Sequence, residues 1–346
     1  MASIIPTLIK KVWGSSLGEN TLKASPKTCV SVTDLFARVE SGNECDYDCT
    51  SCVIKYPKNF KIDEEDELYG TIQEWSTHLL VATGKSDWVR DVADEEGSVM
   101  EAIVKFANVK PNNGRLMLSA SNIPIPSCSA NYADPTSVLL LPAWIIIENV
   151  TPKSVDTLIS EFINKGPVNS TYTCKHSPEN ISLPQNIEGL SSRPCPHSAL
   201  ILLCSQGTRD ARCGQSAPLL KKEFERHLRE YDLLRDLDDE TPGGVGIYFI
   251  SHVGGHRYAA NVIIYRKENS FGLDYAESGE EASEAMSQSL HTDKGLGGAA
   301  QCIWLARVRP NQCQAIIKHT VLRGRVFRPE TQLRGGFDRA RKLYSW

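Results

Sequence analysis

The sequence predicts an α/β protein made of two domains of the same plan in tandem. Two apolar segments, 78–84 (HLLVATG) and 200–207 (LILLCSQG), each begin the same succession of short strands and helices. Aligning Gly84 with Gly207 also aligns Asp87 with Asp210, and this shared order indicates an internal repeat. The succession strand, helix, three strands, helix is typical of a thioredoxin-like α/β sandwich, so we expect two thioredoxin-like domains.

The elements of each copy follow from apolar periodicity and from turn residues. In the first copy we expect a helix near 98–108, a strand at 116–121, a strand pair within 137–150 and a helix after Pro152. In the second copy we expect a helix from Ser216 to about Leu237, strands at 245–251, 258–265 and 302–308, and a helix after Pro310. Ser216 is the expected cap of the long helix, and Pro218 suits its first turn.

Composition shifts predict the domain boundaries. A Pro-rich stretch with Ser and Asn suggests a linker, and an acidic, Ser-rich stretch suggests an inserted loop. The expected organisation is an extension with a Cys-rich segment at 1–70, a degenerate thioredoxin-like domain at 71–166, a linker at 167–196, and a second domain at 197–346 that contains an acidic insert at about 268–293 and a C-terminal tail.

Composition also restricts the function. The 346 residues are 41% hydrophobic and 23% charged, with a net charge of -4, and no apolar run is long enough to span a bilayer. We therefore expect neither a nucleic-acid partner nor a membrane. Eleven cysteines, odd in number and without a secretory signal, favour metal or redox chemistry in a reducing compartment. The expected location is cytoplasmic, with a mitochondrial alternative because Lys10 and Lys11 lie in an acid-free N-terminus.

Four residues of the second copy carry the chemistry. Cys204 ends a predicted strand, Cys213 comes nine residues later, and His252 and His256 lie together after another strand. Two thiolates and two imidazoles suit tetrahedral zinc, or an iron–sulfur cluster in which histidines replace cysteines on one iron. The wide spacing of the two cysteines favours a larger inorganic core over a zinc knuckle.

Residues around these four support a site that only the second copy can form. The first copy has Val81 and Arg90 at the positions of the two cysteines. Gly254 and Gly255 lie between the histidines, where they remove side chains and offer backbone amides to the site.

The same residues carry a family resemblance. The segments CSQGTRDARCGQSAPLL, SHVGGHRYAANVIIY and IWLARVRP, with WSTHLLVATGKSDWVRDV in the first copy, resemble the fungal and plant sucrase/ferredoxin-like family over about 45–346. The resemblance implies a thioredoxin-like ferredoxin domain with a [2Fe–2S] cluster. It implies that Cys204 and Cys213 bind one iron, and that His252 and His256 bind the other, solvent-facing iron.

The function expected from this cofactor is proton-coupled transfer of single electrons. Neutral imidazoles make a cluster less negative, and bis-His [2Fe–2S] centres have potentials of roughly −150 to +300 mV. We expect an electron carrier that meets a redox partner protein, a reductase or an acceptor, rather than an enzyme with its own substrate. No Gly-x-Ser-x-Gly elbow or Walker loop indicates a hydrolase. The alternatives are a thiol–disulfide oxidoreductase that uses Cys49 and Cys52, and a zinc-binding structural protein.

Several secondary signals lie outside the four ligands. Cys45, Cys49 and Cys52 form an accessory redox or metal motif, whereas Cys195 and His197 are expected bystanders next to the linker. Asp87 and Asp210 are expected to cap helix entrances.

The C-terminal region carries two further signals. Trp346 resembles the tail that the cytosolic iron–sulfur assembly machinery reads, with a packed aromatic residue as the alternative. A basic stretch is expected to be a solvated face or a docking patch for an acidic partner, and consists of Arg323, Arg325, Arg328 and Arg334.

Overall fold

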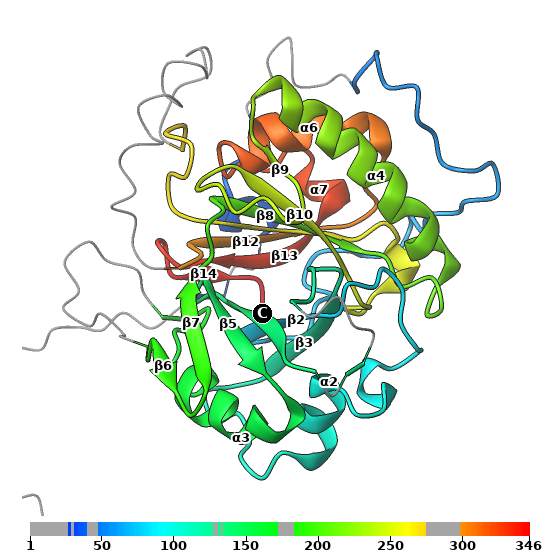
Figure 1. The fold of residues 1–346 in the computed structure, drawn as a ribbon. Helices are drawn as coiled ribbons and strands as arrows, with labels where there is room; N and C mark the ends of the chain where they lie inside the picture. Colours follow the sequence, from blue (N-terminus) through cyan, green and yellow to red (C-terminus); the bar gives the residue numbers. More distant parts are fainter. Residues whose placement is uncertain are drawn as a thin grey trace, which may run out of the picture.

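Short apolar strands form the framework of the molecule (Figure 1). The computed structural model describes residues 27–28, 31–39, 48–126, 131–132, 134–171, 183–274 and 298–346. Within these residues the strands join one mixed sheet in the order β1-β14-β13-β12-β11-β8-β10-β3-β2-β4-β5-β7-β6, and β9 pairs with β10. The predicted α/β class is therefore confirmed. In the described part of the chain, none of the helices combines the length and apolarity needed to cross a bilayer.

The first copy contains four strands, one short 3-10 turn and two longer helical segments. Its elements are β2 (Thr77–Ala82), η1 (Val92–Asp94), α2 (Val99–Glu101), η2 (Ala102–Phe106), β3 (Leu116–Ser121), β4 (Thr136–Leu141), β5 (Ile145–Val150), η3 (Pro152–Ser154), α3 (Val155–Thr157) and η4 (Leu158–Ile163). Ser98 caps α2 by accepting a hydrogen bond from the Glu101 amide.

The second copy has the same order of main elements. They are β8 (Ala199–Cys204), α4 (Ala211–Glu230), β9 (Leu234–Arg235), β10 (Val245–Ile250), η5 (His256–Tyr258), β11 (Val262–Arg266), β12 (Gln301–Leu305), η6 (Pro310–Gln312), α6 (Cys313–Ala315) and η7 (Ile316–Val321). The remaining elements are β1 (Lys27–Thr28), α1 (Val32–Leu35), β6 (Asn186–Ile187), β7 (Leu190–Pro194), α7 (Pro329–Gln332), β13 (Leu333–Asp338) and β14 (Leu343–Tyr344).

Strand pairing is repeated between the two copies. In the first, β2 runs parallel to β3 and antiparallel to β4, which pairs with β5. In the second, β8 runs parallel to β10 and antiparallel to β11, which pairs with β12. The copies join where β10 meets β3 in antiparallel pairing, with Ile250 opposite Ser121. The two copies therefore share one sheet instead of forming two separate ones.

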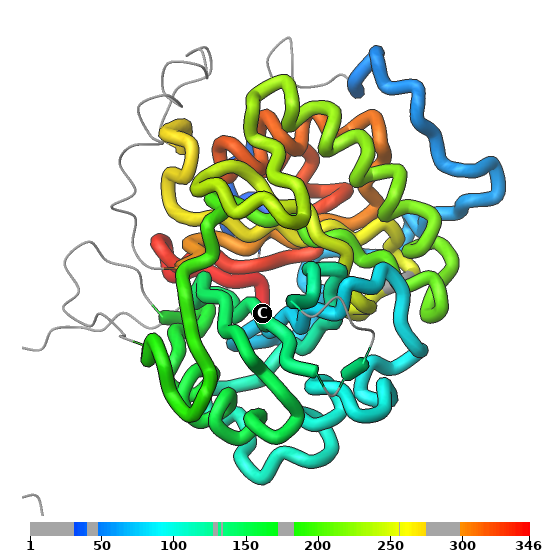
Figure 2. Tube along the Cα trace, in the orientation of Figure 1, coloured from blue at the N-terminus to red at the C-terminus, as the bar shows by residue number. Residues whose placement is uncertain are grey.

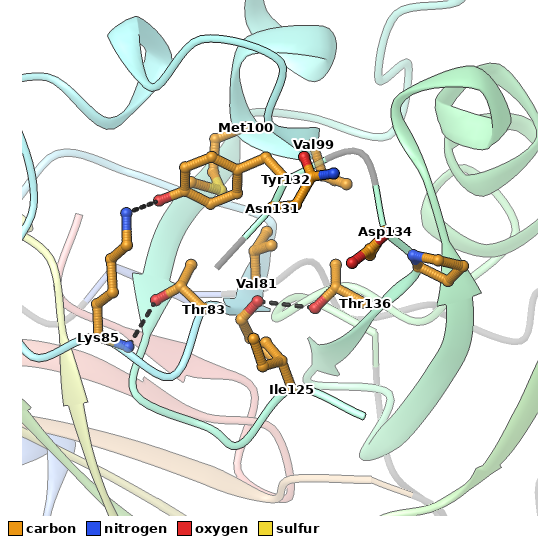
Figure 3. A pocket seen from close by; sticks show the side chains of 12 residues that line it. Val81, Thr83, Lys85, Val99, Met100, Ile125, Asn131, Tyr132, Asp134 and Thr136 are labelled. Atoms are coloured by element: carbon orange, nitrogen blue, oxygen red, sulfur yellow. Dashed lines mark hydrogen bonds between the residues drawn. The ribbon is translucent and has the colours of Figure 1, made fainter. Parts of the chain in front are cut away.

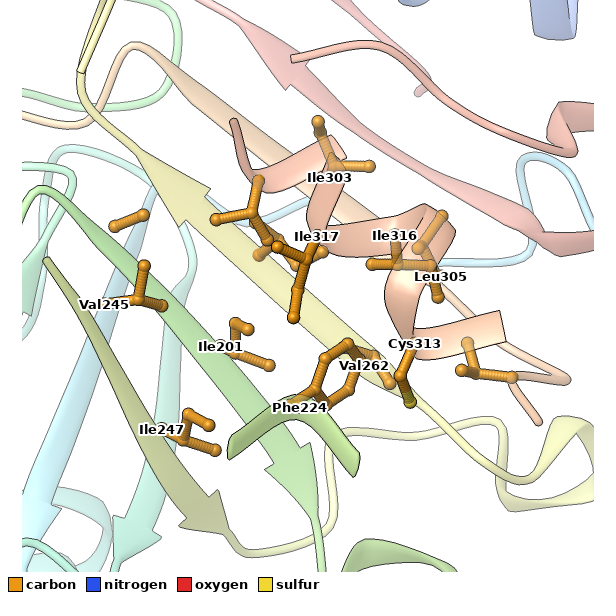
Figure 4. Packing of buried hydrophobic residues seen from close by; sticks show 14 of the residues in the cluster. Ile201, Phe224, Val245, Ile247, Val262, Ile303, Leu305, Cys313, Ile316 and Ile317 are labelled. Carbon is orange, nitrogen blue, oxygen red and sulfur yellow. The ribbon is translucent and has the colours of Figure 1, made fainter. Parts of the chain in front are cut away.

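Alternation along the strands creates separate cores. On β8, Ile201 faces α4 and η7, where Phe224 and Ile317 cover it (Figure 4). Leu203 belongs to the same cluster. The residues between them, such as Leu202, belong to an inner core that both copies share. Because successive strand side chains point to opposite faces, each strand contributes to two cores. In Figure 1 the helices α4, α6 and α7 lie on one side of the strands, and α2 and α3 lie on the other.

Two predictions about the second copy and the linker are corrected by the structure. The long helix spans Ala211–Glu230. It begins at Ala211 because the Asp210 side chain, six residues before Ser216, accepts a hydrogen bond from the Arg212 amide and caps the helix. Ser216 is buried inside this helix. The predicted linker 167–196 contains β6 and β7, and β7 extends the sheet by pairing with β5. The acidic insert lies largely outside the described residues.

Candidate metal centre

Strand register brings Cys204 and His252 to the same edge of the sheet. Cys204 is the last residue of β8, and it lies opposite Ile250, the last residue of the parallel strand β10. His252 lies two residues further along the chain. The carboxyl ends of parallel neighbours are the usual location of ligand sites in α/β sheets, since the chain turns away there and leaves room for functional groups.

Cys213 reaches this edge from the first turn of α4. The helix begins after Asp210, which places the thiol of Cys213 near the helix N-terminus and close to the end of β8. The thiol is 1% exposed and that of Cys204 is 3% exposed, whereas His252 is half-buried. The sulfur atoms therefore lie on the inner side of the group, and the imidazole lies toward the surface.

The three side chains converge closely enough to share one centre. The ligand atoms of Cys204, Cys213 and His252 all lie within 4.8 Å of one another, and 3.9 Å separates Cys204 Sγ from His252 Nδ1. A hydrogen bond with the Cys213 thiol, supported by His252, lowers the pKa of Cys204 to about 5 although burial opposes this. The same hydrogen bond, together with burial, raises the pKa of Cys213. The side chain of His256, which begins η5, lies outside the described residues.

Arg334 supports the histidine segment, residues 251–258, from inside the protein. Its guanidinium is 2% exposed and donates hydrogen bonds to the Gly254 carbonyl and to Asn261 Oδ1, at 3.1 and 2.9 Å. It also lies over the rings of Trp304 and Tyr258. Gly255 has φ of 69°, and a Cβ there would overlap the guanidinium. Glycine is therefore needed at Gly255 for both its conformation and this close approach.

The first copy holds the ligand segment, residues 204–213, in place. Ser205 Oγ donates to the Ser86 carbonyl, and Thr208 donates to Asp87 through its amide and hydroxyl. Gln206 is 1% exposed, and its side-chain amide both donates and accepts hydrogen bonds. Its Nε2 donates to the Val89 carbonyl, and its Oε1 accepts from the His252 amide at 2.8 Å. One side chain thus links the first copy, the ligand segment and the histidine segment.

The equivalent edge of the first copy has no cysteine or histidine among its described residues. Val81 takes the position of Cys204, and the pocket there is lined by apolar residues such as Val99 and Met100 and by polar residues that include Asp134 (Figure 3). Lys85 also lines this pocket, donates to the Tyr132 hydroxyl at 2.8 Å and forms an ion pair with Glu95 at 3.5 Å. The described residues of this pocket therefore provide no thiol or imidazole.

The expected bystanders lie at the other end of β8 from Cys204. Cys195 and His197 precede the strand and are buried. His197 forms a hydrogen bond with the Tyr248 hydroxyl at 2.9 Å, and burial lowers the pKa of His197 to about 4. Burial raises the pKa of the Cys195 thiol to about 11. The structure does not bring these two residues to the group formed by Cys204, Cys213 and His252, called here the Cys204 group.

The N-terminal cysteine motif lies away from this edge. Cys49 contacts Arg226 in the C-terminal half of α4, Cys52 interacts with Glu223 on the same helix, and Cys45 lies outside the described residues. Asp210 caps α4 as predicted. Asp87, in addition to accepting a hydrogen bond from the Trp88 amide, binds Thr208 in the second copy.

The C-terminal signals are partly corrected. Arg334 is not part of a surface patch, because it is buried beneath the histidine segment, while Arg323, Arg325 and Arg328 are half-buried. Trp346 packs beside Trp75, with ring centroids 4.6 Å apart. This contact is the packed-aromatic alternative, and recognition of the tail by an assembly factor stays a prediction.

The sequence matches the model of the sucrase/ferredoxin-like family over residues 68–335, which is more than half of the chain. The chain belongs to this family. The region that matches the family model thus includes both copies and all four predicted ligands, whereas Cys49, Cys52 and Trp346 lie outside it.

Curated relatives of this sucrase/ferredoxin-like chain are fungal proteins. It is 28% identical to actin patches distal protein 1 of Saccharomyces cerevisiae over 333 residues, which cover 89% of this chain and 88% of that protein. It is 33% and 30% identical to altered inheritance of mitochondria protein 32 of Clavispora lusitaniae and Debaryomyces hansenii, over 38% and 37% of this chain. The matched segments span about a third of those two proteins. No solved structure matches the chain.

Sequence reasoning missed two residues that shape the site in this sucrase/ferredoxin-like protein. Gln206 lies within the recognised ligand segment, and its position two residues after a ligand was the one signal for it. Arg334 has no local signal, because more than 70 residues separate it from the histidine segment that it supports.

Proposed function

We propose that this protein binds a [2Fe–2S] cluster through Cys204, Cys213, His252 and His256 and transfers single electrons. The observation that carries the proposal is the convergence of two thiols and an imidazole within 4.8 Å at one sheet edge. Family membership supports it, because the matched region contains all four residues. The thioredoxin-like ferredoxin fold and cytoplasmic location are part of this proposal, with the mitochondrion as the alternative location.

The residues at this edge fit such a cofactor. Cysteine thiolates and histidine nitrogens are the ligands of mixed [2Fe–2S] centres. A hydrogen bond between the two thiols lowers the pKa of Cys204 and raises that of Cys213, and loss of both thiol protons would give the thiolate pair that one iron requires. The same donors suit zinc, so metal identity is the first quantity to measure.

The residues around the candidate centre give it a buried inner side and a solvent-facing outer side, which have different roles in electron transfer. The cluster would supply a one-electron couple. The buried thiols keep water from the inner side, while the half-buried His252 gives a redox partner a short path from the surface. Gln206 fixes the backbone of His252, and an imidazole ligand can exchange a proton on its second nitrogen, which makes transfer dependent on pH.

Partners follow from the same proposal. A reductase or acceptor would dock over the histidine segment, where the imidazole is nearest to solvent. The tail at Trp346 would be read by the cytosolic iron–sulfur assembly machinery only if the contact with Trp75 opens, since the two rings now lie together.

Colour and metal content test the proposal. Protein purified without oxygen should be red-brown, contain about two irons per chain and lose both properties in Cys204→Ser. Cys195→Ala is the matched control, because Cys195 is an equally buried thiol before the opposite end of β8. Colourless protein that contains one zinc would contradict electron transfer and favour the structural alternative.

A further inference from the structure

The segment around Cys49 and Cys52 is a second candidate site that is separate from the cluster ligands. Figure 2 shows this blue segment on the same side of the molecule as α4. The Cys49 amide donates to the Asn311 carbonyl at 2.8 Å, and Asp48 forms an ion pair with Arg328 at 3.1 Å. The segment is therefore anchored to the second copy and presents its cysteines in a fixed place.

The two cysteines occupy the ends of one turn. The Cys52 amide donates to the Cys49 carbonyl at 3.4 Å. A four-residue turn of this kind brings its end Cα atoms within about 7 Å, and disulfides span Cα distances of roughly 4.4–6.8 Å. Both residues are half-buried with free thiols, so the turn can close into a disulfide and solvent can reach the sulfur atoms.

The two thiols have different surroundings. Arg226 Nη2 lies 3.7 Å from Cys49 Sγ, and Ser51 Oγ lies 3.2 Å from the same sulfur. Although burial opposes them, these hydrogen bonds lower the pKa of the Cys49 thiol. Burial, together with the charge and hydrogen bond of Glu223, raises the pKa of the Cys52 thiol, although a hydrogen bond to the Ile54 carbonyl opposes this. Cys49 is thus the thiol that is ready to attack, and Cys52 retains its proton beside a carboxylate.

We propose that Cys49 and Cys52 form a redox dithiol that reduces small anionic disulfides, with Cys49 attacking and Cys52 resolving. Negative charge in the substrate is favoured because residues 49–61 carry three lysines and no acidic side chain. The three lysines, Lys55, Lys58 and Lys61, are all exposed.

The exchange balances without any other reactant. Cys49 gives its proton to water and its thiolate bonds to one sulfur of the disulfide. The original sulfur–sulfur bond breaks, and the first thiolate leaves and takes up a proton from water. Cys52 passes its proton to Glu223 and attacks Cys49 Sγ. The mixed disulfide breaks, and the second leaving thiolate takes up the proton. Two protein thiols are oxidised to one disulfide, and the substrate is reduced to two thiols.

A metal at this turn is the competing explanation. Within the described residues, only the Cys204 group brings three metal-ligating atoms within 4.8 Å of one another. The Cys49 turn offers two thiols with an arginine beside one of them, and a cation next to the first sulfur favours a thiolate but repels a metal ion.

Peptide-resolved redox titration of the full chain tests the proposal. Protein is equilibrated anaerobically with mixtures of reduced and oxidised glutathione, quenched, alkylated and digested. Peptide 39–55 should pass reversibly from two free thiols at Cys49 and Cys52 to a bond between them, as a two-electron step, while Cys313 stays reduced. In Cys52→Ser, a mixed disulfide with glutathione should accumulate on Cys49.

A helix variant isolates the role of the arginine. Arg226→Gln should slow alkylation of Cys49 at pH 7 severalfold, up to roughly tenfold for one pKa unit. Arg229→Gln is the control, since Arg229 lies on the same helix and pairs with Glu225 instead. Three results would overturn the proposal: no disulfide at any buffer ratio, a bond that joins Cys45 instead, or zinc that the wild-type protein binds and that Cys52→Ser loses.

Discussion

The two copies of the repeat share a scaffold and differ in the residues at the ends of their first strands and helices. β8 ends in Cys204 and leads to a capped helix that carries Cys213, whereas β2 leads past Val81 to a short helix that begins with Val99. Pairing of the strands is the same in both. A change of a few residues at strand and helix ends is therefore enough to give one copy a candidate metal centre and the other an apolar pocket.

The first copy nevertheless contributes to the site of the second. Its segment 86–90 accepts hydrogen bonds from Ser205, Gln206, Thr208 and Arg209, which all lie between the two cysteines. Without such contacts, the eight residues between the two cysteines would lose considerable conformational entropy when the site becomes ordered. We infer that the degenerate copy acts as a rigid support for the ligand segment.

The largest loss of stability is expected from removing the hydrogen bonds of Gln206, which link the first copy to the candidate site. Gln206→Ala leaves the His252 amide and the Val89 carbonyl without their partner in the interior, which costs about 3 kcal/mol of unfolding free energy. Urea unfolding measures that loss. Hydrogen exchange of residues 251–258 should also accelerate, because the histidine segment loses its tie.

Thr83→Ala is the matched variant in the first copy. Thr83 aligns with Gln206, but its hydroxyl bonds Ser121 and Trp88 within its own copy. This variant should lower stability without changing exchange at 251–258. Equal exchange in wild-type protein and Gln206→Ala would show that the bonds between copies do not hold the candidate site.

Local sequence signals identified most strands but could not fix all boundaries. The strand predicted at 116–121 agrees with β3, because its apolar run is bounded by turn residues on both sides. The start of α4 was misplaced because Asp210 and Ser216 are both good capping residues, and only the fold decides that Ser216 is buried.

Long-range contacts explain the remaining differences. Composition suggested a linker at 167–196, yet within it pairing with β5 makes 190–194 a strand that buries Leu190. The role of Arg334 depends on residues far away in the sequence, so no periodicity or motif could indicate it. The candidate ligands were accessible to sequence reasoning because chemistry restricts residue type and the repeat supplied an internal comparison.

A smaller effect is expected from acid, through a buried histidine in each copy. His78 lies between the copies, bonded to Tyr265 and Ser119, and burial lowers its pKa to about 3. The unfolded chain binds a proton near pH 6.5 whereas the folded chain does not, so stability falls as pH decreases from about 6.5 toward 3. Between pH 7 and 5 the loss is on the order of 2 kcal/mol.

Replacing His78 and His197 one at a time shows whether the two copies unfold together in one transition or separately in two. His78→Gln should reduce the pH dependence of urea unfolding between pH 7 and 5 across the whole transition. His197→Gln removes a histidine bonded within the second copy, so with separate unfolding it would change only that copy's transition. Unchanged pH dependence in His78→Gln would contradict the assignment of a neutral buried imidazole.

The smallest effect concerns the cations near the two equivalent edges. Lys85 in the first copy is paired with Glu95, whereas the hydrogen-bond acceptors of Arg334 are the neutral oxygens of Thr71, Gly254 and Asn261. Burial lowers the pKa of Arg334 to about 10, so the group remains charged at pH 7. A buried cation beside Cys204 would stabilise an electron added to the proposed cluster, and Arg334→Met should lower the midpoint of that cluster by on the order of tens of millivolts. Arg334→Lys retains the charge but loses the planar set of hydrogen-bond donors of the guanidinium. In spectroelectrochemical titration, a midpoint of Arg334→Lys near the wild-type value would attribute the effect to charge. A drop equal to that of Arg334→Met would attribute it to the lost hydrogen bonds.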